Sequence, residues 1–158
     1  MRHVLIAAAL AAVLSSPARA EDKARAACEK ILPPAIASRI AGRSVKIGDA
    51  NTYGFTTLCA YNDGQVLVLF LSYSPSLTPA QFDDMYVKTA IGARKAVAGV
   101  GDEAFLAVTT PGAKESVLTV RKGKSVATIT PGMDPATMKV TLTETQKVEL
   151  AKAAAAKL

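Results

Sequence analysis

The sequence predicts an α+β domain with an antiparallel sheet of about six strands and three helices. Apolar residues recur at helical spacing near the start, in the middle and at the end of the mature chain. Between these segments lie short alternating or apolar runs, in two groups of three, separated by turns that contain glycine. A chain of 158 residues can bury one hydrophobic core, so we expect a single domain.

The first twenty residues have the pattern of a secretory signal peptide. A basic start at Arg2 and His3 is followed by an apolar run and by Ala18-Arg19-Ala20, a small-residue cleavage site. The run is too short to span a bilayer. A mitochondrial presequence is the alternative, but the arginines are not scattered as in such peptides. We therefore expect residues 1–20 to be removed and residues 21–158 to act in the periplasm or outside the cell.

Charge and histidine content exclude several classes of function. His3 is the only histidine, so the mature chain would have none. The formal net charge of +6 would fall to +4, because the signal segment holds two basic residues, Arg2 and Arg19, and no acidic one. A net charge of +4 on a chain of this size is smaller than is typical of a nucleic-acid-binding protein. Without imidazole, Ser-His-Asp and Cys-His nucleophiles and His-rich metal sites are excluded. We expect no catalytic residue, no metal and no cofactor.

The two cysteines, Cys28 and Cys59, are expected to form a disulfide, because an exported chain with two thiols most simply pairs them. The spacing is not C-x-x-C, which argues against a catalytic redox pair. A free or intermolecular thiol is the alternative. The crosslink would hold the first helix against the sheet.

The first half of the mature chain is expected to contain a helix over residues 21–32, a second short helix from Pro34 to Gly42, and three strands. The expected strands cover residues 44–47, 55–61 and 65–73, with a loop at 48–51 and an Asp-Gly turn at 62–64.

The strand over residues 65–73 is apolar on both faces. Simple alternation places Val66, Val68 and Phe70 on one face, and the other face carries three leucines, at positions 67, 69 and 71. Two interpretations remain open: a central strand covered on both faces, or a strand with one apolar face that lines a groove or a dimer contact.

The second half repeats the order of helix and three strands. Thr78 and Gln81 form a capping box that opens the middle helix, and Thr143 and Gln146 form one that opens the last helix. The middle helix carries an apolar stripe of Phe82, Met85, Tyr86, Thr89 and Ala90. The expected strands cover residues 104–109, 116–121 and 125–130, with a turn at Pro111-Gly112 and loops at 92–101 and 131–140. Lys147, Lys152 and Lys157 are expected to be solvated. An offset of 59 residues superposes the two halves, Gly64 on Gly123, which hints at two α-β-β-β units, although the identity between the halves is too low to prove a duplication.

Three cations, Arg121, Lys122 and Lys124, gather at the tip of a predicted hairpin. They are candidates for contact with an anionic partner, such as an acidic lipid headgroup, a cell-wall polymer or a protein. A solvated turn that keeps hairpins from pairing edge to edge is the alternative.

The acidic pairs Asp83-Asp84 and Asp102-Glu103 are poor candidates for acid-base catalysis, because neighbouring side chains in a helix or strand point apart. The segment Gly99-Val100-Gly101-Asp102 precedes a strand instead of a helix. We therefore interpret it as a glycine turn with Asp102 bonded to nearby backbone, and not as a phosphate-binding loop.

Several features together resemble a known family. Cys28 lies in the first helix, and Cys59 precedes the turn Tyr61-Asn62-Asp63-Gly64. The phrase Val-Ala-Gly-Val-Gly-Asp-Glu-Ala follows at 97–104, and the last helix contains Leu150-Ala151-Lys152. The chain thus resembles small exported domains related to the extracytoplasmic sensor domain of a mycobacterial serine/threonine kinase and its lipoprotein relatives. The resemblance implies an α+β domain with a stabilising disulfide and a ligand cleft. The chain departs from that family in lacking a kinase segment, a membrane anchor and a second disulfide.

These observations favour a non-enzymatic protein that binds a ligand or an envelope protein, with no nucleic-acid partner and with a weak contact to an anionic envelope surface through Arg121, Lys122 and Lys124. One alternative is a structural envelope component that self-associates through the doubly apolar strand. Another is an enzyme that uses carboxylates or a Ser/Lys pair.

Overall fold

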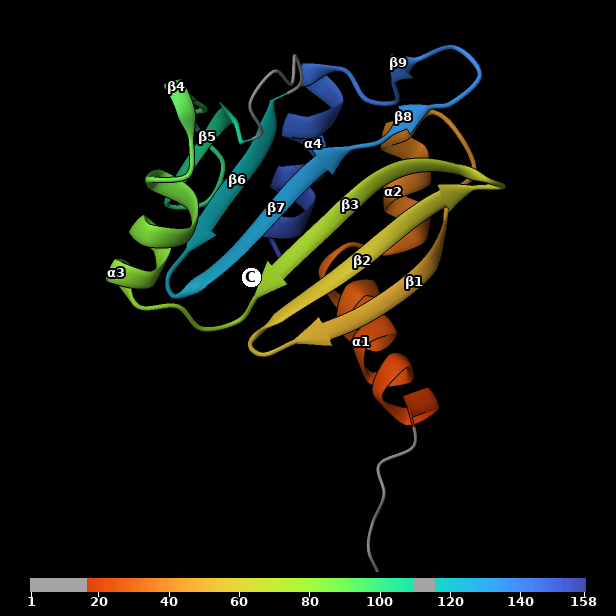
Figure 1. Ribbon diagram of the computed structural model, residues 1–158, viewed down its shortest axis with the longest axis horizontal. Helices are drawn as coiled ribbons and strands as arrows, with labels where there is room; N and C mark the ends of the chain where they lie inside the picture. Colours follow the sequence, from red (N-terminus) through yellow and green to blue (C-terminus); the bar gives the residue numbers. More distant parts are fainter. Residues whose placement is uncertain (1–16, 110–115) are drawn as a thin grey trace, which may run out of the picture.

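One large antiparallel sheet organises the chain, and helices lie on both its faces (Figure 1). The computed structural model describes residues 17–109 and 116–158. Most of the expected signal segment and the Pro111-Gly112 turn lie outside these residues. The expected fold class, α+β with an antiparallel sheet, is confirmed.

The main sheet has seven strands in the order β1-β2-β3-β7-β6-β5-β4. Their bounds are β1 Lys46–Tyr53, β2 Thr56–Asp63, β3 Val66–Ser74, β4 Ile91–Ala96, β5 Glu103–Val108, β6 Val117–Lys122 and β7 Ser125–Pro131. A small second sheet pairs β8 (Met133–Asp134) with β9 (Lys139–Val140). The helices are α1 Pro17–Ile31, α2 Pro34–Ala41, α3 Pro79–Phe82 and α4 Glu144–Ala155, and a π-helical turn, η1 (Asp83–Val87), continues α3.

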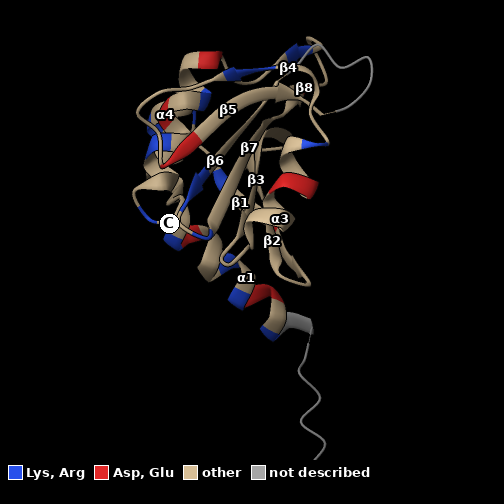
Figure 2. Ribbon diagram, turned by 90° about the vertical axis from the view of Figure 1, so that its left-hand side faces the viewer, with Lys and Arg blue, Asp and Glu red and all other residues tan. Residues whose placement is uncertain are grey.

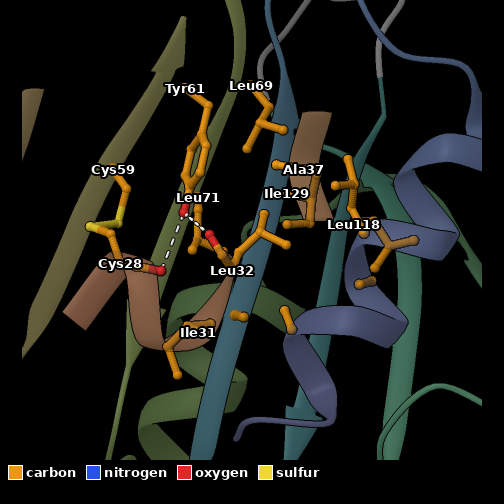
Figure 3. Close-up of a cluster of buried hydrophobic side chains, with 14 of the residues drawn as sticks. Cys28, Ile31, Leu32, Ala37, Cys59, Tyr61, Leu69, Leu71, Leu118 and Ile129 are labelled. Atoms are coloured by element: carbon orange, nitrogen blue, oxygen red, sulfur yellow. Dashed lines mark hydrogen bonds between the residues drawn. A yellow bond between two sulfur atoms is a disulfide. The ribbon is translucent and has the colours of Figure 1, made fainter. Parts of the chain in front are cut away.

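Helices α1, α2 and α4 cover one face of the sheet, called here the first face (Figure 1). The main core lies between them and the sheet. The disulfide between Cys28 of α1 and Cys59 of β2 crosses this layer, as predicted. Next to it, the buried hydroxyl of Tyr61 donates to the carbonyl of Leu32 at 2.6 Å and also lies within 3.2 Å of the carbonyl of Cys28 (Figure 3). The end of α1 is therefore fixed to the sheet by covalent and polar contacts.

The opposite face, called the second face, is covered only in part. Figure 2 shows α3 and α4 on opposite sides of the sheet. Phe82 of α3 packs with Phe105 of β5 and Val126 of β7 in a separate small core that Tyr86 and other residues of η1 complete. The helix therefore shields the second face over β5–β7, and the face over β1–β3 lies beyond it.

Three hairpins share one turn chemistry. The turns are Gly54-Phe55, Gly64-Gln65 and Gly123-Lys124, and each glycine has a φ near +60°. Glycine at the first central position suits a two-residue turn between twisted strands. The expected Asp-Gly turn is therefore displaced by one residue, because Asp63 still pairs with Val66 inside the ladder.

The edge strands differ most from expectation. Residues 91–96 form β4, most of which lies in the expected loop at 92–101, and all six residues are exposed. At the opposite edge, β1 extends to Tyr53 and absorbs the expected loop as a bulge between Ile47 and Ala50. The guanidinium of Arg25 donates to the carbonyls of Ile47 and Gly48 at 2.6 and 2.7 Å, so α1 holds this bulge in place.

The helices and the loop before the last helix also differ from the expected structure. Helix α1 begins at Pro17, so the acidic residues 21 and 22 lie beyond its first turn. The expected loop at 131–140 contains β8 and β9, which pair with each other. The hydroxyl of Thr141 donates to the carbonyl of Val68 and so ties this segment to β3. Lys147 was expected to be solvated but is buried, and its ammonium group donates hydrogen bonds to the carbonyl and the hydroxyl of Ser116.

The strands, but not the helices, follow a two-unit plan. The meanders β1-β2-β3 and β5-β6-β7 meet at the antiparallel pair β3–β7. Their second hairpins, at Gly64 and Gly123, lie at opposite ends of the sheet (Figure 1). Helix α3 lies on the second face and α1 on the first face, and β4 is an additional strand in the second half. The expected α-β-β-β repeat therefore holds only for the two three-strand meanders.

Candidate functional site

A pocket of about 260 Å³ lies on the second face, between α3 and the hairpin that joins β6 to β7. We call it the α3 pocket. Its apolar wall consists of Leu77, Phe82 and Val126, which belong to the small core or border it. The capping box of Thr78 and Gln81, predicted from the sequence, begins α3 at this point and so sets the position of Phe82. The loop before α3 is fixed in turn, because the N–H of Leu77 donates to the carbonyl of Lys124 at 2.8 Å.

Arg121 forms the polar side of the α3 pocket. Its Nε and Nη2 donate to Oε2 of Glu103 at 3.4 and 3.3 Å, and its Nη1 donates to the carbonyl of Gly123 at 3.2 Å. Its guanidinium carbon lies 5.5 Å from the centre of the Phe82 ring, within cation–π range. The side chain is therefore held in one orientation. A guanidinium has more N–H donors than these three contacts use, so it can still receive an anion.

The three predicted cations do not form one patch. Arg121 and Lys124 line the α3 pocket. Lys122 points to the other face, where its Nζ donates to the carbonyl of Ala155 at the end of α4 at 3.0 Å. This contact matches a cation with the negative end of a helix. Alternation along β6 explains the separation, since neighbouring side chains leave opposite faces of a strand.

Lys124 is the cation most accessible to a ligand at this pocket. It is exposed at the hairpin turn and lines the α3 pocket. Among residues 17–109 and 116–158, it makes no ion pair. Two acids also line the pocket, Glu103, which is paired with Arg121, and Asp83, which makes no ion pair among the described residues. An anionic group that enters the pocket would therefore meet an ammonium group that no carboxylate pairs, and the charge of Asp83 would act against it.

Asp102 has a structural role at the neighbouring loop. Its Oδ2 accepts from the N–H of Gly123 at 2.6 Å, and its own N–H donates to the carbonyl of Arg121 at 2.8 Å. The expected glycine turn before β5 is thus found, and Asp102 is bonded to the backbone of a segment distant in sequence, the β6–β7 hairpin. Asp102 is committed to this clamp, and Asp84 is paired with Lys88.

The second face over β1–β3 is open. Phe70, in the middle of β3, is 43% exposed, and Leu58, in the middle of β2, is 38% exposed. Of the two interpretations for this strand, full cover on both faces is therefore wrong. A bulge at Val68 also breaks the simple alternation, so that Val68 joins Leu69 and Leu71 in the core of the first face.

The pocket itself could not be assembled from the sequence. The sequence showed the capping box and the cations. The pocket, however, joins Leu77 to Val126, which lie 49 positions apart, and the long-range β3–β7 pairing and the hydrogen bond from Leu77 to Lys124 bring them together. Within the part of the chain that the structure describes, no three His, Cys, Asp or Glu side chains gather as a metal site. Among those same residues, no helix has the length and apolar character to cross a membrane.

Comparisons with protein-family models, with curated proteins and with solved structures found no match to this chain. The resemblance to an extracytoplasmic sensor domain stays a prediction that rests on the residues quoted above.

Proposed function

We propose that this protein is a non-enzymatic binding protein that acts outside the cytoplasm and holds a small amphipathic anion, or the matching group of an envelope partner, in the α3 pocket. The observation that carries this proposal is a pocket with an apolar wall, formed around Phe82, beside two cations, Arg121 and Lys124. Ligand sites are concave and mostly apolar, with a few fixed polar groups. At about 260 Å³ the pocket lies just below the range of about 300 to 1,000 Å³ that is usual for such sites, which favours a small ligand.

Orientation of the ligand follows from the same residues. The apolar part would contact Leu77, Phe82 and Val126, and the anionic group would meet Lys124 and the remaining donors of Arg121. Arg121 is oriented before the ligand arrives, by Glu103 and by the Phe82 ring. Such preorganisation lowers the entropic cost of binding.

Two further observations support the role and the compartment. Asp102 and Glu103, the adjacent carboxylates considered for the alternative enzyme, are engaged with Gly123 and Arg121, which supports a binding role over acid-base catalysis by this pair. The disulfide between Cys28 and Cys59 favours export, because disulfides persist in oxidising compartments.

Native mass spectrometry tests the proposal. Mature wild-type protein, the Lys124→Glu variant and the Lys139→Glu variant are incubated with envelope extract and repurified. Lys139 is exposed on β9, outside the pocket, so its variant changes the net charge equally and serves as the control. We expect a retained small molecule on the wild type and the control, and at least a tenfold lower occupancy on Lys124→Glu.

Two outcomes would contradict the proposal. One is a wild-type protein that returns from the extract without added mass. The other is turnover of any substrate in a broad hydrolase panel by the purified mature chain.

A further inference from the structure

The charged residues that line the α3 pocket balance each other in number. Among the described residues of its lining, Arg121 and Lys124 are basic, and Asp83 and Glu103 are acidic. Arg121 and Glu103 neutralise each other in an ion pair. Lys124 and Asp83 make no ion pair within the described part of the chain. The pocket therefore offers a ligand one unpaired positive charge and one unpaired negative charge.

Asp83 is available at the pocket because the cation of the same helical segment has another partner. Asp83 follows Phe82, whose ring forms part of the apolar wall, and begins the π-helical turn. Lys88, at the end of that turn, pairs with Asp84. The hydrogen bond to Asp84 is the main cause that raises the pKa of Lys88, and the charge of Asp83 is the smallest of the causes. Lys88 is therefore committed to Asp84.

We propose that the anionic group held in the α3 pocket belongs to a zwitterion, an α-amino acid with an apolar side chain. This inference rests on the proposed function and narrows it. The carboxylate of the ligand would meet Lys124 and the remaining donors of Arg121, its ammonium group would meet Asp83, and its side chain would contact Phe82. A ligand with an anionic group alone would pair with Lys124 but would be repelled by Asp83. A zwitterion satisfies both unpaired charges.

The volume of the pocket agrees with a ligand of this size. A dry cavity of about 150 Å³ holds benzene, which has six non-hydrogen atoms. By the same proportion, a pocket of about 260 Å³ holds about ten such atoms. Leucine has nine, so an amino acid with a side chain of this size fills the pocket.

The spacing of the two charges in an α-amino acid also suits the pocket. The pocket lies between α3 and the β6–β7 hairpin, so that Asp83 approaches from the helix and Lys124 from the hairpin. A sphere of the pocket's volume is roughly 8 Å across. Charge-assisted hydrogen bonds are about 2.8 Å long, and one carbon joins the ammonium and carboxylate groups, so the ligand can bridge a gap of roughly 8 to 9 Å. Both ends of the ligand can therefore be paired at once.

Isothermal titration calorimetry of the mature protein with three probes tests the inference. Leucine carries both charges, isocaproate is leucine without the ammonium group, and isoamylamine is leucine without the carboxylate. Isocaproate is more apolar than leucine, so contact with the wall and with Lys124 alone would make it bind at least as tightly. At low ionic strength, where exposed charges are least screened, we expect leucine to bind at least threefold more tightly than isocaproate. Isoamylamine should bind at least tenfold more weakly than leucine, because Lys124 and Arg121 lose their partner.

Two neighbouring acids provide a matched pair of variants. Asp83→Asn removes the carboxylate at the pocket. Asp84→Asn changes the net charge equally, but Asp84 pairs with Lys88 and does not line the pocket. Both side chains are exposed, so neither substitution disturbs the core. We expect Asp83→Asn to abolish the preference for leucine over isocaproate, and Asp84→Asn to keep it.

The outcomes separate this inference from the proposed function. If isocaproate binds the wild type as tightly as leucine, the inference is overturned, while the binding of an amphipathic anion stands. An Asp83→Asn variant that keeps the preference for leucine overturns it as well. Binding of none of the three probes at millimolar concentration also overturns it, and the experiment with envelope extract then decides the proposed function separately.

Discussion

Tyr61 shows how one polar side chain fixes a helix end. It is fully buried, yet its hydroxyl donates to the carbonyl of Leu32, which ends the turn after α1. Burial raises the pKa of Tyr61 well above its ordinary value, and the negative charge of Glu29 raises the pKa further. The folded protein therefore strongly favours the neutral phenol, and only the unfolded chain ionises readily.

Tyr61 should make the protein sensitive to alkali. Because the pKa is raised in the folded state, the stabilisation is fully present below about pH 10, the ordinary pKa of tyrosine, and is lost as the pH rises above it. We expect Tyr61→Phe to lower the free energy of unfolding by about 1 to 3 kcal/mol at neutral pH, because it leaves a buried carbonyl without its donor. Above pH ~10, the free energy of unfolding of the variant should also fall less steeply with pH than that of the wild type. Urea unfolding at neutral and alkaline pH measures both effects. An alkaline decline as steep in the variant as in the wild type would show that Tyr61 is not the group responsible.

Gly99 and Gly101 provide a matched pair for the loop that Asp102 clamps. Both have positive φ, +72° and +61°, so alanine costs roughly 1 to 2 kcal/mol of backbone strain at either position. A Cβ at Gly99 meets nothing within 4 Å, whereas at Gly101 it would lie 2.5 Å from the carbonyl oxygen of Arg121. We expect Gly101→Ala to lower the midpoint of thermal unfolding clearly more than Gly99→Ala. Equal effects would mean that the loop does not lie against β6 as described.

Among the elements, the hairpins at Gly64 and Gly123 and the capping boxes followed from local chemistry and could be predicted, whereas the β1–β2 hairpin at Gly54 was not expected. The capping boxes at Thr78 and Thr143 are both present. Strand β4 could not be predicted, because its six residues show no apolar alternation and become a strand only by pairing with β5. The burial of Lys147 was missed for a related reason: its partner, Ser116, lies 31 residues earlier. The sequence shows local patterns, whereas these features depend on tertiary contacts.

Helix α4 offers a test of that buried lysine. Lys147 is 4% exposed and donates to the carbonyl of Ser116 at 2.9 Å, whereas Lys152 of the same helix is exposed and paired with Glu149. Lys147→Met keeps the apolar stem and removes the donor, so we expect a loss of about 1 to 3 kcal/mol in the free energy of unfolding. Lys152→Met should change it by less than about 0.5 kcal/mol. Guanidinium unfolding of both variants measures the difference, and similar values for the two would refute a structural role for Lys147.

At the scale of the whole molecule, the disulfide connects the helix layer to the sheet over a separation of 31 residues. Its pairing could be predicted from the cysteine count and the expected export, because there was only one way to join two thiols. The α3 pocket and the open half of the second face could not be predicted, because both depend on the side of the sheet that α3 covers. The turn and helix patterns in the sequence do not determine which face of the sheet α3 covers.

Removal of the crosslink should weaken the entire domain. We expect the Cys28→Ala, Cys59→Ala double variant to lose roughly 3 to 4 kcal/mol of unfolding free energy, mainly because the unfolded chain regains the freedom of the closed loop. Its urea m-value should rise, because the unlinked chain exposes more surface on unfolding. Reduction of the wild type should reproduce both changes. An unchanged unfolding midpoint would show that the link adds nothing to stability.

The bulge that Arg25 holds in β1 has a consequence for growth into fibrils. Strand addition needs a straight edge with free carbonyls, and Arg25 already occupies those of Ile47 and Gly48. At the far edge, Arg94 and Lys95 place two like charges in the middle of β4. Neither rim of the sheet is therefore a good template for further strands. The folded protein should therefore resist growth by strand addition at either edge of the sheet.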